Sequence, residues 1–322
     1  MTRHARLARS WTRTLLPVLA AAAFGATVAV LPAGAYRLGA ERAVAAPASV
    51  AAVHQAIVAG ASVTKVPPTL QPSLKDAATD GEQVQACAGT ASDNGEAEFG
   101  GCIYGAPNAK RTFVLVGDSH AAMWFDGLQQ AAILGGWKMR FFVRSGCPVV
   151  QLNFYGPEGG KDCNVWRAQA IKAIRKLKPD MIVLTSASLL QLVSKNTPAT
   201  SAQWETGWKA TLNKLKMPQT KLVILGDIPI LKQSAPECLA AHESDVQACS
   251  TPRSDALQGV LDDAEIAAAQ ATGASRIDTT NWLCAAICPP IVDNILVYRD
   301  QYHISRHYSL YLAGVLRAAL PH

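Results

Sequence analysis

Short apolar runs alternate with amphipathic segments from residue 112 onward, and this alternation is the strongest constraint on the fold. Runs typical of strands lie at 112–116, 138–143, 181–184, 221–225 and 276–278, and each is followed by a helical pattern, at 119–134, 166–177, 204–215, 254–271 and 304–319. Uniformly apolar strands of this length are buried on both faces of a sheet. Strand–helix alternation in turn favours parallel pairing. The sequence therefore predicts a three-layer α/β/α sandwich around a parallel sheet.

The amino terminus has the pattern of an export signal. Residues 1–14 form a basic n-region, and residues 15–36 carry no charged side chain. The uncharged run is long enough to cross a bilayer and longer than an ordinary secretory h-region. We expect a signal anchor or a signal peptide, with small-residue cleavage sites at 33–35 and 43–45. Either form exports the rest of the chain, whereas a buried core helix would not begin with a basic, uncapped segment.

Residues 37–85 are rich in Ala, Pro, Ser, Thr and Gln and show no sustained period, which predicts a flexible linker. Residues 86–322 then form the predicted catalytic domain. The formal net charge of +6 comes mostly from residues 1–42, because 24 of the 30 basic and 23 of the 24 acidic residues lie after them. A nearly neutral body argues against a nucleic-acid partner.

All eight cysteines lie in the predicted domain, as an exported protein with disulfides would have them. They form four close pairs in the sequence, 87 with 102, 147 with 163, 238 with 249 and 284 with 288. Pairing of neighbours is the simplest connectivity, although eight cysteines allow 105. A zinc site at Cys284 and Cys288 is the alternative, but no second close pair or paired histidine supports it. We expect neither a metal nor a cofactor.

The tetrapeptide Gly117-Asp118-Ser119-His120 joins the first predicted strand to the first predicted helix. Ligands of parallel sheets bind beyond the carboxyl ends of the strands. A serine at this position has its hydroxyl at that edge, beside free N–H groups of a helix N-terminus that stabilise an oxyanion. Capping of the helix by Asp118 or Ser119 explains the motif equally well.

A second tetrapeptide, Asp300-Gln301-Tyr302-His303, precedes the last predicted helix. Spacing of three places Asp300 and His303 on one face of a helical turn. The carboxylate would then orient the imidazole as the general base of a serine triad. The alternative is an Asp N-cap beside a surface histidine, which is the interpretation that we prefer for His307.

Together these motifs resemble those of the SGNH, or GDSL-type, hydrolase superfamily. They are most similar to the SGNH domain found fused to membrane acyltransferase-3 proteins. Further stretches carry the likeness, namely SGCP at 145–148, KLVILGD at 221–227, PECL at 236–239 and the segment 297–305. The resemblance covers about residues 86–322 and implies a flavodoxin-like parallel sheet.

The resemblance implies that Ser119 is the nucleophile, His303 the base and Asp300 its carboxylate. It also implies the Ser119 N–H and Gly146 as oxyanion donors. The superfamily's third donor is an Asn in a GxND motif, but after the third strand this chain reads TSAS at 185–188. Where one such donor has been removed, the loss of transition-state stabilisation is about 2.7–4 kcal/mol. We therefore expect a replacement group or slow turnover.

The expected function is that of an exported serine esterase or O-acyltransferase acting on cell-envelope glycan or glycolipid. Because the chain has one candidate span, a separate acyltransferase-3 membrane protein is the expected source of the acyl group. The rival interpretation is a non-catalytic glycan-binding module. A phosphate-binding domain would need a glycine-rich loop, which is missing. Trp204 and Trp208 could stack on a sugar, but packing against the sheet explains their spacing better.

Overall fold

The computed structural model describes residues 49–84, 102–155, 161–188, 192–194, 197–257 and 259–321. The predicted n-region and the apolar segment 15–36 lie outside these residues. Contacts divide the chain into Met1–Arg42 and Ala43–His322, and every described residue belongs to the second unit. Within the described ranges, no helix is both long and apolar enough to cross a membrane.

A six-stranded sheet forms the middle layer, in the order β1-β3-β2-β4-β7-β9. Its strands are β1 (Tyr104–Gly105), β2 (Arg111–Gly117), β3 (Trp137–Val143), β4 (Met181–Thr185), β7 (Lys221–Leu225) and β9 (Ser275–Ile277). All neighbours pair in parallel except β1, which is antiparallel to β3 at the edge. The chain goes from β2 to β3 on one side and then to β4 on the other. The predicted flavodoxin-like order is thus confirmed, with the switch point at β2.

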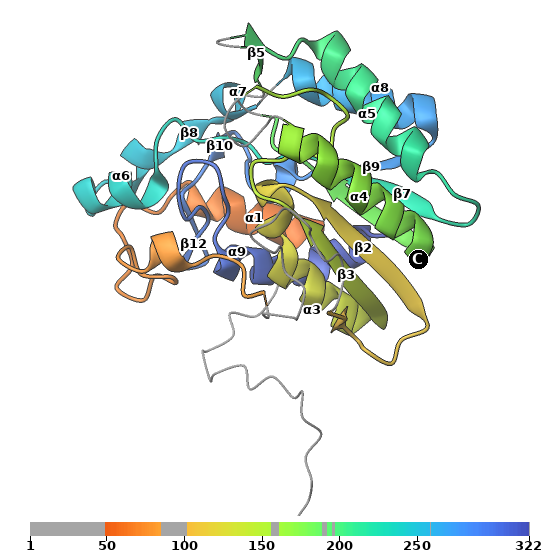
Figure 1. Ribbon diagram of the computed structural model, residues 1–322. Helices are drawn as coiled ribbons and strands as arrows, with labels where there is room; N and C mark the ends of the chain where they lie inside the picture. Colours follow the sequence, from red (N-terminus) through yellow and green to blue (C-terminus); the bar gives the residue numbers. More distant parts are fainter. Residues whose placement is uncertain are drawn as a thin grey trace, which may run out of the picture. The chain divides into compact units, whose positions relative to one another are not determined.

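Helices cover both faces of the sheet (Figure 1). One face carries α3 (Phe125–Gly135), α9 (Arg306–Tyr311) and α10 (Ala313–Ala319), and the other carries α4 (Lys161–Leu177), α5 (Ser201–Leu215) and α8 (Val260–Thr272). Strand β2 serves both cores, because Phe113 and Leu115 belong to the first and Val114 and Val116 to the second. This alternation is that of a strand buried on both sides. The predicted three-layer sandwich is therefore confirmed.

Three predicted helices are interrupted. The helix predicted over 119–134 is α2 (Ser119–Ala122) followed by α3, because the Trp124 N–H bonds to the Ala121 carbonyl only three residues back. The helix predicted over 254–271 is α7 (Arg253–Ala256) and α8, and Gly259 between them has a positive φ of 37°. The last one is α9 and α10, divided at Leu312.

Shorter elements surround the sandwich. They are η1 (Ala77–Thr79), β5 (Leu192–Ser194), β6 (Thr197–Pro198), α6 (Ala235–Ala241), η2 (Val246–Cys249), β8 (Thr251–Pro252), η3 (Thr280–Trp282), β10 (Ile287–Cys288), β11 (Ile291–Val292) and β12 (Ile295–Leu296).

The linker predicted over 37–85 is wrong for residues 49–84, which pack on the domain. Helix α1 (Val50–Gly60) buries Val53 and Ile57 completely, in the same core as β11 and β12. After it, the Gln71 N–H bonds to the Asn294 carbonyl, and the Gln71 carbonyl accepts the Leu296 N–H. One fully buried apolar pair at i and i+4 is too short a pattern to predict a helix from the sequence. Burial of that pair in the core stabilises α1 instead.

Three of the four expected neighbour pairs form disulfides, Cys147–Cys163, Cys238–Cys249 and Cys284–Cys288. Cys102 is also disulfide-bonded, while Cys87 lies outside the described residues. Zinc binding by Cys284 and Cys288 is excluded, because a sulfur in a disulfide is not a thiolate ligand.

Candidate active site

A tight elbow at the carboxyl end of β2 presents Ser119. A Cβ on Gly117 would lie 2.0 Å from the Thr185 carbonyl oxygen of β4 and 2.8 Å from the Ala121 Cβ of α2. Only glycine fits where the neighbouring strand and the following helix approach so closely. This close approach places residue 119 directly at the rim of the sheet.

Asp118 caps the short helix α2, which leaves the Ser119 side chain available. The Asp118 carboxylate accepts the N–H groups of His120 and Ala187, each at 2.9 Å. Burial raises the pKa of Asp118, against the lowering effects of the nearby His120 and of these two N–H groups. Of the two interpretations of the tetrapeptide, capping therefore belongs to Asp118, and the Ser119 hydroxyl has a different partner.

Asp300 and His303 lie in a tight turn before α9, and the helical turn predicted for them is wrong. The Asp300 Oδ1 accepts the N–H groups of Tyr302 and His303, at 2.6 and 2.7 Å. The turn is closed by the Arg299 N–H bonded to the His303 carbonyl. Asp300 thus fixes the backbone through one oxygen, as short carboxylates do in turns, and leaves the other for the imidazole.

The structure brings the three predicted side chains together in a chain of hydrogen bonds. His303 Nε2 lies 3.0 Å from Ser119 Oγ, and His303 Nδ1 lies 2.8 Å from Asp300 Oδ2. Burial would raise the pKa of Asp300, but its bonds to the His303 ring and to the turn hold that pKa below its ordinary value. An ionised carboxylate, an imidazole and a hydroxyl in this order are the arrangement of a serine triad.

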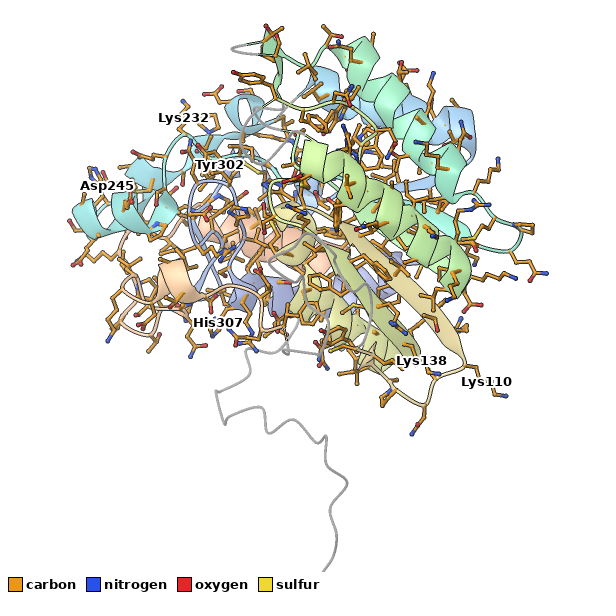
Figure 2. The ribbon with its side chains drawn as sticks, viewed as in Figure 1. Lys110, Lys138, Lys232, Asp245, Tyr302 and His307 are labelled. Atoms are coloured by element: carbon orange, nitrogen blue, oxygen red, sulfur yellow. A yellow bond between two sulfur atoms is a disulfide. The ribbon has the colours of Figure 1, made fainter. Side chains whose placement is uncertain are left out.

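The triad residues lie at the carboxyl end of the sheet, as the alternation of strands and helices predicts. Figure 2 shows Lys110 and Lys138 at the opposite, amino end of β2 and β3, and Tyr302, from the turn of His303, beyond the carboxyl end. The His303 side chain is 19% exposed and that of Asp300 42% exposed, so the site opens to solvent.

Gly146 lies on the loop after β3, with a left-handed φ of 71°. This loop begins beside the elbow, because Val143 pairs with Gly117. The loop after β4 contributes differently, since its Ala187 N–H goes to Asp118 and both the N–H and the hydroxyl of Ser188 go to Asp227. The segment that carries an Asn in the superfamily therefore supports two carboxylates here.

A second histidine–carboxylate pair, which the sequence analysis missed, lies beside the first. His120 Nδ1 is 2.5 Å from Asp227 Oδ1, and both side chains are almost fully buried. Burial would lower the pKa of His120, but the Asp227 carboxylate raises it above its ordinary value. Burial would raise the pKa of Asp227, but the His120 charge, its hydrogen bond to the His120 ring and those to Ser188 lower it. One signal was present, because a Gly-Asp pair stands at the carboxyl end of β7, at 226–227, as another does at the carboxyl end of β2, at 117–118.

Other candidates from the sequence have structural roles. Trp204 and Trp208 are fully buried, which confirms packing and excludes stacking on a sugar. His307 is not a bare surface residue, because its N–H and its ring both bond to the Asp80 carboxylate.

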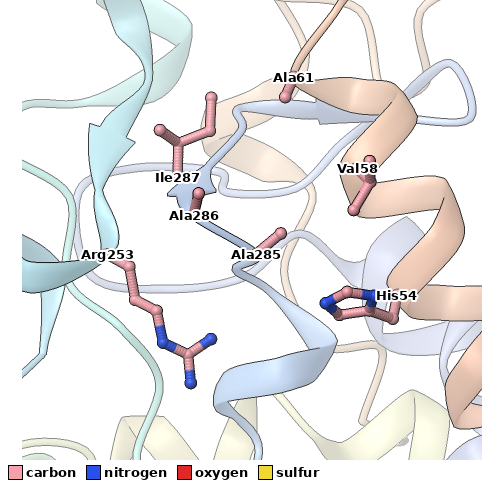
Figure 3. A pocket seen from close by; sticks show the side chains of 7 residues that line it. All are labelled: His54, Val58, Ala61, Arg253, Ala285, Ala286 and Ile287. Carbon is pink, nitrogen blue, oxygen red and sulfur yellow. The ribbon is translucent and has the colours of Figure 1, made fainter.

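A pocket of about 480 Å³ lies away from the triad, and none of the three side chains lines it. Figure 3 shows α1 with His54 and Val58 on one side of it, and Arg253 on the other. Among the described residues, no group of three or more His, Cys, Asp or Glu side chains could hold a metal ion.

Comparisons with known proteins find a similar fold and a matching family. The periplasmic domain of a lipopolysaccharide acetyltransferase from Salmonella serovar Paratyphi A matches with a TM-score of 0.52 at 16% identity, over 64% of this chain and 82% of that one. An α/β hydrolase from the metagenome of Lake Arreo, Spain, matches with a TM-score of 0.39 at 14% identity, over 66% and 98%. No curated protein sequence matches the chain. The model of the SGNH domain fused to AT3 (acyltransferase-3) domains matches residues 86–318. The chain therefore belongs to this family of SGNH domains.

Proposed function

We propose that this domain is a serine acyl-group enzyme, an O-acyltransferase or esterase, with Ser119 as its nucleophile. The supporting observation is the hydrogen-bonded series from Ser119 Oγ through His303 to Asp300 Oδ2, with distances of 3.0 and 2.8 Å. Ser119 Oγ attacks the carbonyl carbon of an ester while His303 Nε2 takes its proton. The tetrahedral oxyanion is stabilised by the backbone N–H of Ser119 and by Gly146.

Collapse of the tetrahedral intermediate breaks the ester bond. His303 returns the proton to the leaving alkoxide, and the acyl group remains on Ser119 Oγ. In the second half-reaction His303 deprotonates the acceptor hydroxyl, which attacks the acyl carbon and restores the serine. Water as the acceptor gives hydrolysis, and a sugar hydroxyl gives O-acyl transfer. Asp300 stabilises the imidazolium in both halves.

The proposed substrates are the acylated glycans or glycolipids of the cell envelope, on the extracytoplasmic side. The family to which the chain belongs is described as fused to AT3 domains. The neighbour of similar fold is a periplasmic domain of a lipopolysaccharide acetyltransferase. Disulfides also favour an oxidising compartment. An AT3 membrane protein is the proposed source of acyl groups, and the segment 15–36 is the proposed export signal or anchor.

Labelling with a fluorophosphonate tests the nucleophile directly, without knowledge of the substrate. The native protein with intact disulfides should be labelled on Ser119, and Ser119→Ala should lose the label. Ser254→Ala is the matched control, because Ser254 is exposed on α7 and bonds only locally to Asp255. His303→Gln should slow labelling by about 10²-fold or more, the scale of general-base catalysis. An unlabelled native protein that also fails to cleave p-nitrophenyl acetate would contradict the proposal.

One observation favours a second candidate, a glycan-binding module without catalysis. The loop at 185–188 has no Asn, and its N–H groups at Ala187 and Ser188 are committed to carboxylates. If the native protein is unreactive but binds an envelope glycan, this second function replaces the first.

A further inference from the structure

We propose that His120, paired as a cation with Asp227, is a positioning residue of this site: it balances the buried carboxylates beside Ser119 and supports the His303 ring. The inference rests on the proposed function for its catalytic part. His120 lies in the GDSH tetrapeptide and Asp227 in the KLVILGD stretch, and the family resemblance gives neither residue a role.

The pair is built into the protein interior. His120 is 3% exposed and Asp227 7% exposed. The other hydrogen bonds of the Asp227 carboxylate are fixed, since Oδ2 accepts the N–H and the hydroxyl of Ser188, both at 2.8 Å, and Oδ1 also accepts the Ile228 N–H. A carboxylate held in this way can orient an imidazole without moving itself.

His120 contacts the general base directly. The His120 and His303 rings lie 5.2 Å apart, centroid to centroid, with 65° between their planes. This is the edge-to-face geometry that aromatic rings prefer. Because His120 follows Ser119 in the chain, a single short helix sets both the nucleophile and the support for its base.

The charges around the serine explain why a cation is needed there. Asp118 and Asp227 are buried, and Asp300 completes a set of three carboxylates that act on His120. An oxyanion that forms beside them is disfavoured unless positive charge balances them. The loop at 185–188 adds no amide side chain to help. The raised pKa of His120 and the lowered pKa of Asp227 agree with an ion pair.

The charged surroundings of the pair come from several elements. Beyond Asp118 and Asp300, the Asp227 charge affects the pKa of Asp262, Glu265 and Tyr298. Arg276 forms ion pairs with Asp262 and Glu265. Arg276 bonds to Glu265 and Asp262, so its charge is already shared, and His120 is the cation in contact with Asp227.

A charge-removal series on the full chain tests the catalytic part. His120→Gln should lower kcat for p-nitrophenyl acetate by about 10- to 100-fold, somewhat less than the loss of a direct oxyanion donor, with KM within about twofold. The double variant H120Q/D227N removes both charges and should recover about tenfold over H120Q. If His120 acted only through packing, the double variant would not recover kcat. Unchanged kcat in H120Q, or a double variant no faster than H120Q, overturns the proposal.

Histidine NMR tests the pair independently of activity. In protein labelled with ¹⁵N-histidine, the His120 ring should carry protons on both nitrogens at pH 7, and Asp227→Asn should make it neutral there. His242→Gln, at an exposed position at the end of α6, is the matched control for assignment and folding. A neutral His120 ring in the native protein overturns the proposal. A native protein that is unreactive towards fluorophosphonate contradicts the proposed function, and with it the catalytic part, while the NMR result still decides the ion pair.

Discussion

At the scale of single residues, Gly117 has the most restricted environment in the site. Its missing side chain lets β4 and α2 approach the elbow, and any Cβ would collide with backbone rather than with a flexible side chain. Thr185 is the last residue of β4 and pairs there with Gly117, so its carbonyl cannot move aside without disturbing the pairing of the two strands. The geometry of Ser119 therefore depends on a residue that has no side chain.

Gly117→Ala should destabilise the fold by about 1–3 kcal/mol or more, as overpacking does, and should abolish labelling of Ser119 by a fluorophosphonate. Urea unfolding and labelling at equal folded fraction measure the two effects. Gly273→Ala is the control, since Gly273 is the left-handed C-cap of α8 and its Cβ would meet open space. This variant should lose about 1–2 kcal/mol of stability without loss of label. Full labelling of Gly117→Ala would contradict the prediction.

The His120–Asp227 pair predicts a pH-dependent stability. Because the pKa of His120 is raised in the folded protein, protonation of His120 stabilises the fold fully at pH values below its ordinary pKa of 6.5. This stabilisation is lost as the pH rises through the folded pKa. Because the pKa of Asp227 is lowered in the folded protein, its ionised carboxylate stabilises the fold fully at pH values above its ordinary pKa of 3.8. This stabilisation is lost as the pH falls through the folded pKa. The difference in unfolding free energy between native protein and His120→Gln should therefore be larger at pH 6 than at pH 9. An equal difference at both pH values would show that the ion pair adds nothing.

The sequence predicted that Ser119, Asp300 and His303 would meet, because each lies in a short motif whose place next to a strand or helix could be recognised. Ser119 follows an apolar strand, and Asp300 and His303 are three residues apart. It did not predict His120 with Asp227, because 107 residues separate them and neither motif alone requires the contact. A pair of Gly-Asp sequences after two parallel strands is the pattern that would have indicated it.

At the scale of elements, the segment from 76 to 84 holds the turn that carries His303. The Asp80 carbonyl accepts the Arg306 N–H, and its carboxylate binds the N–H and ring of His307. Asp126 of α3 joins the two, because it accepts both the Gln83 N–H and the Arg306 Nε–H. A segment expected to be linker therefore fixes the start of α9, directly after the turn that carries His303.

Asp80→Asn should weaken this attachment and lower both stability and the rate of labelling. The side chain of Asp80 is only 9% exposed, so loss of its charge should destabilise by about 1–3 kcal/mol. Labelling should slow several-fold, because the turn of His303 loses an anchor. Asp255→Asn breaks an exposed ion pair with Lys232 instead and should leave both measurements unchanged. Equal behaviour of the two variants would show that Asp80 does not support the turn.

Helix boundaries were less predictable than strands. The apolar runs predicted the ends of the strands to within about one residue, because the central strands β2, β4 and β7 are buried on both faces. The helices at 119–134, 254–271 and 304–319 are broken by local hydrogen bonding and by a glycine, which the period of apolar residues does not report. Helix α1 escaped prediction because its stability comes from the core it covers.

At the scale of the whole described domain, the family's segment is extended by a part of the chain that precedes it. The family model begins at residue 86, whereas Val53 and Ile57 are fully buried in the core shared with β11 and β12. The folded unit is therefore larger than the matched segment.

Ile57→Ala should cost about 2–5 kcal/mol in urea unfolding, the range for truncating a fully buried Ile. Val58→Ala is the matched control one residue later, because Val58 is 50% exposed, and its effect should be much smaller. A small effect of Ile57→Ala would mean that α1 is a peripheral attachment. A single unfolding transition, seen alike by fluorescence and circular dichroism, should accompany the large effect.

The described fold also begins much earlier in the chain than the sequence predicted. Helix α1 begins at Val50, so only residues 37–48 separate the proposed anchor from the first described residue, where the sequence alone predicted a tether reaching to residue 85. Fully extended, so few residues span at most about 40 Å. If the segment 15–36 is retained as the proposed anchor, so short a spacer favours lipid-linked acceptors at the bilayer surface over distant polymer. Cleavage at 33–35 or 43–45 would release the same folded domain to diffuse.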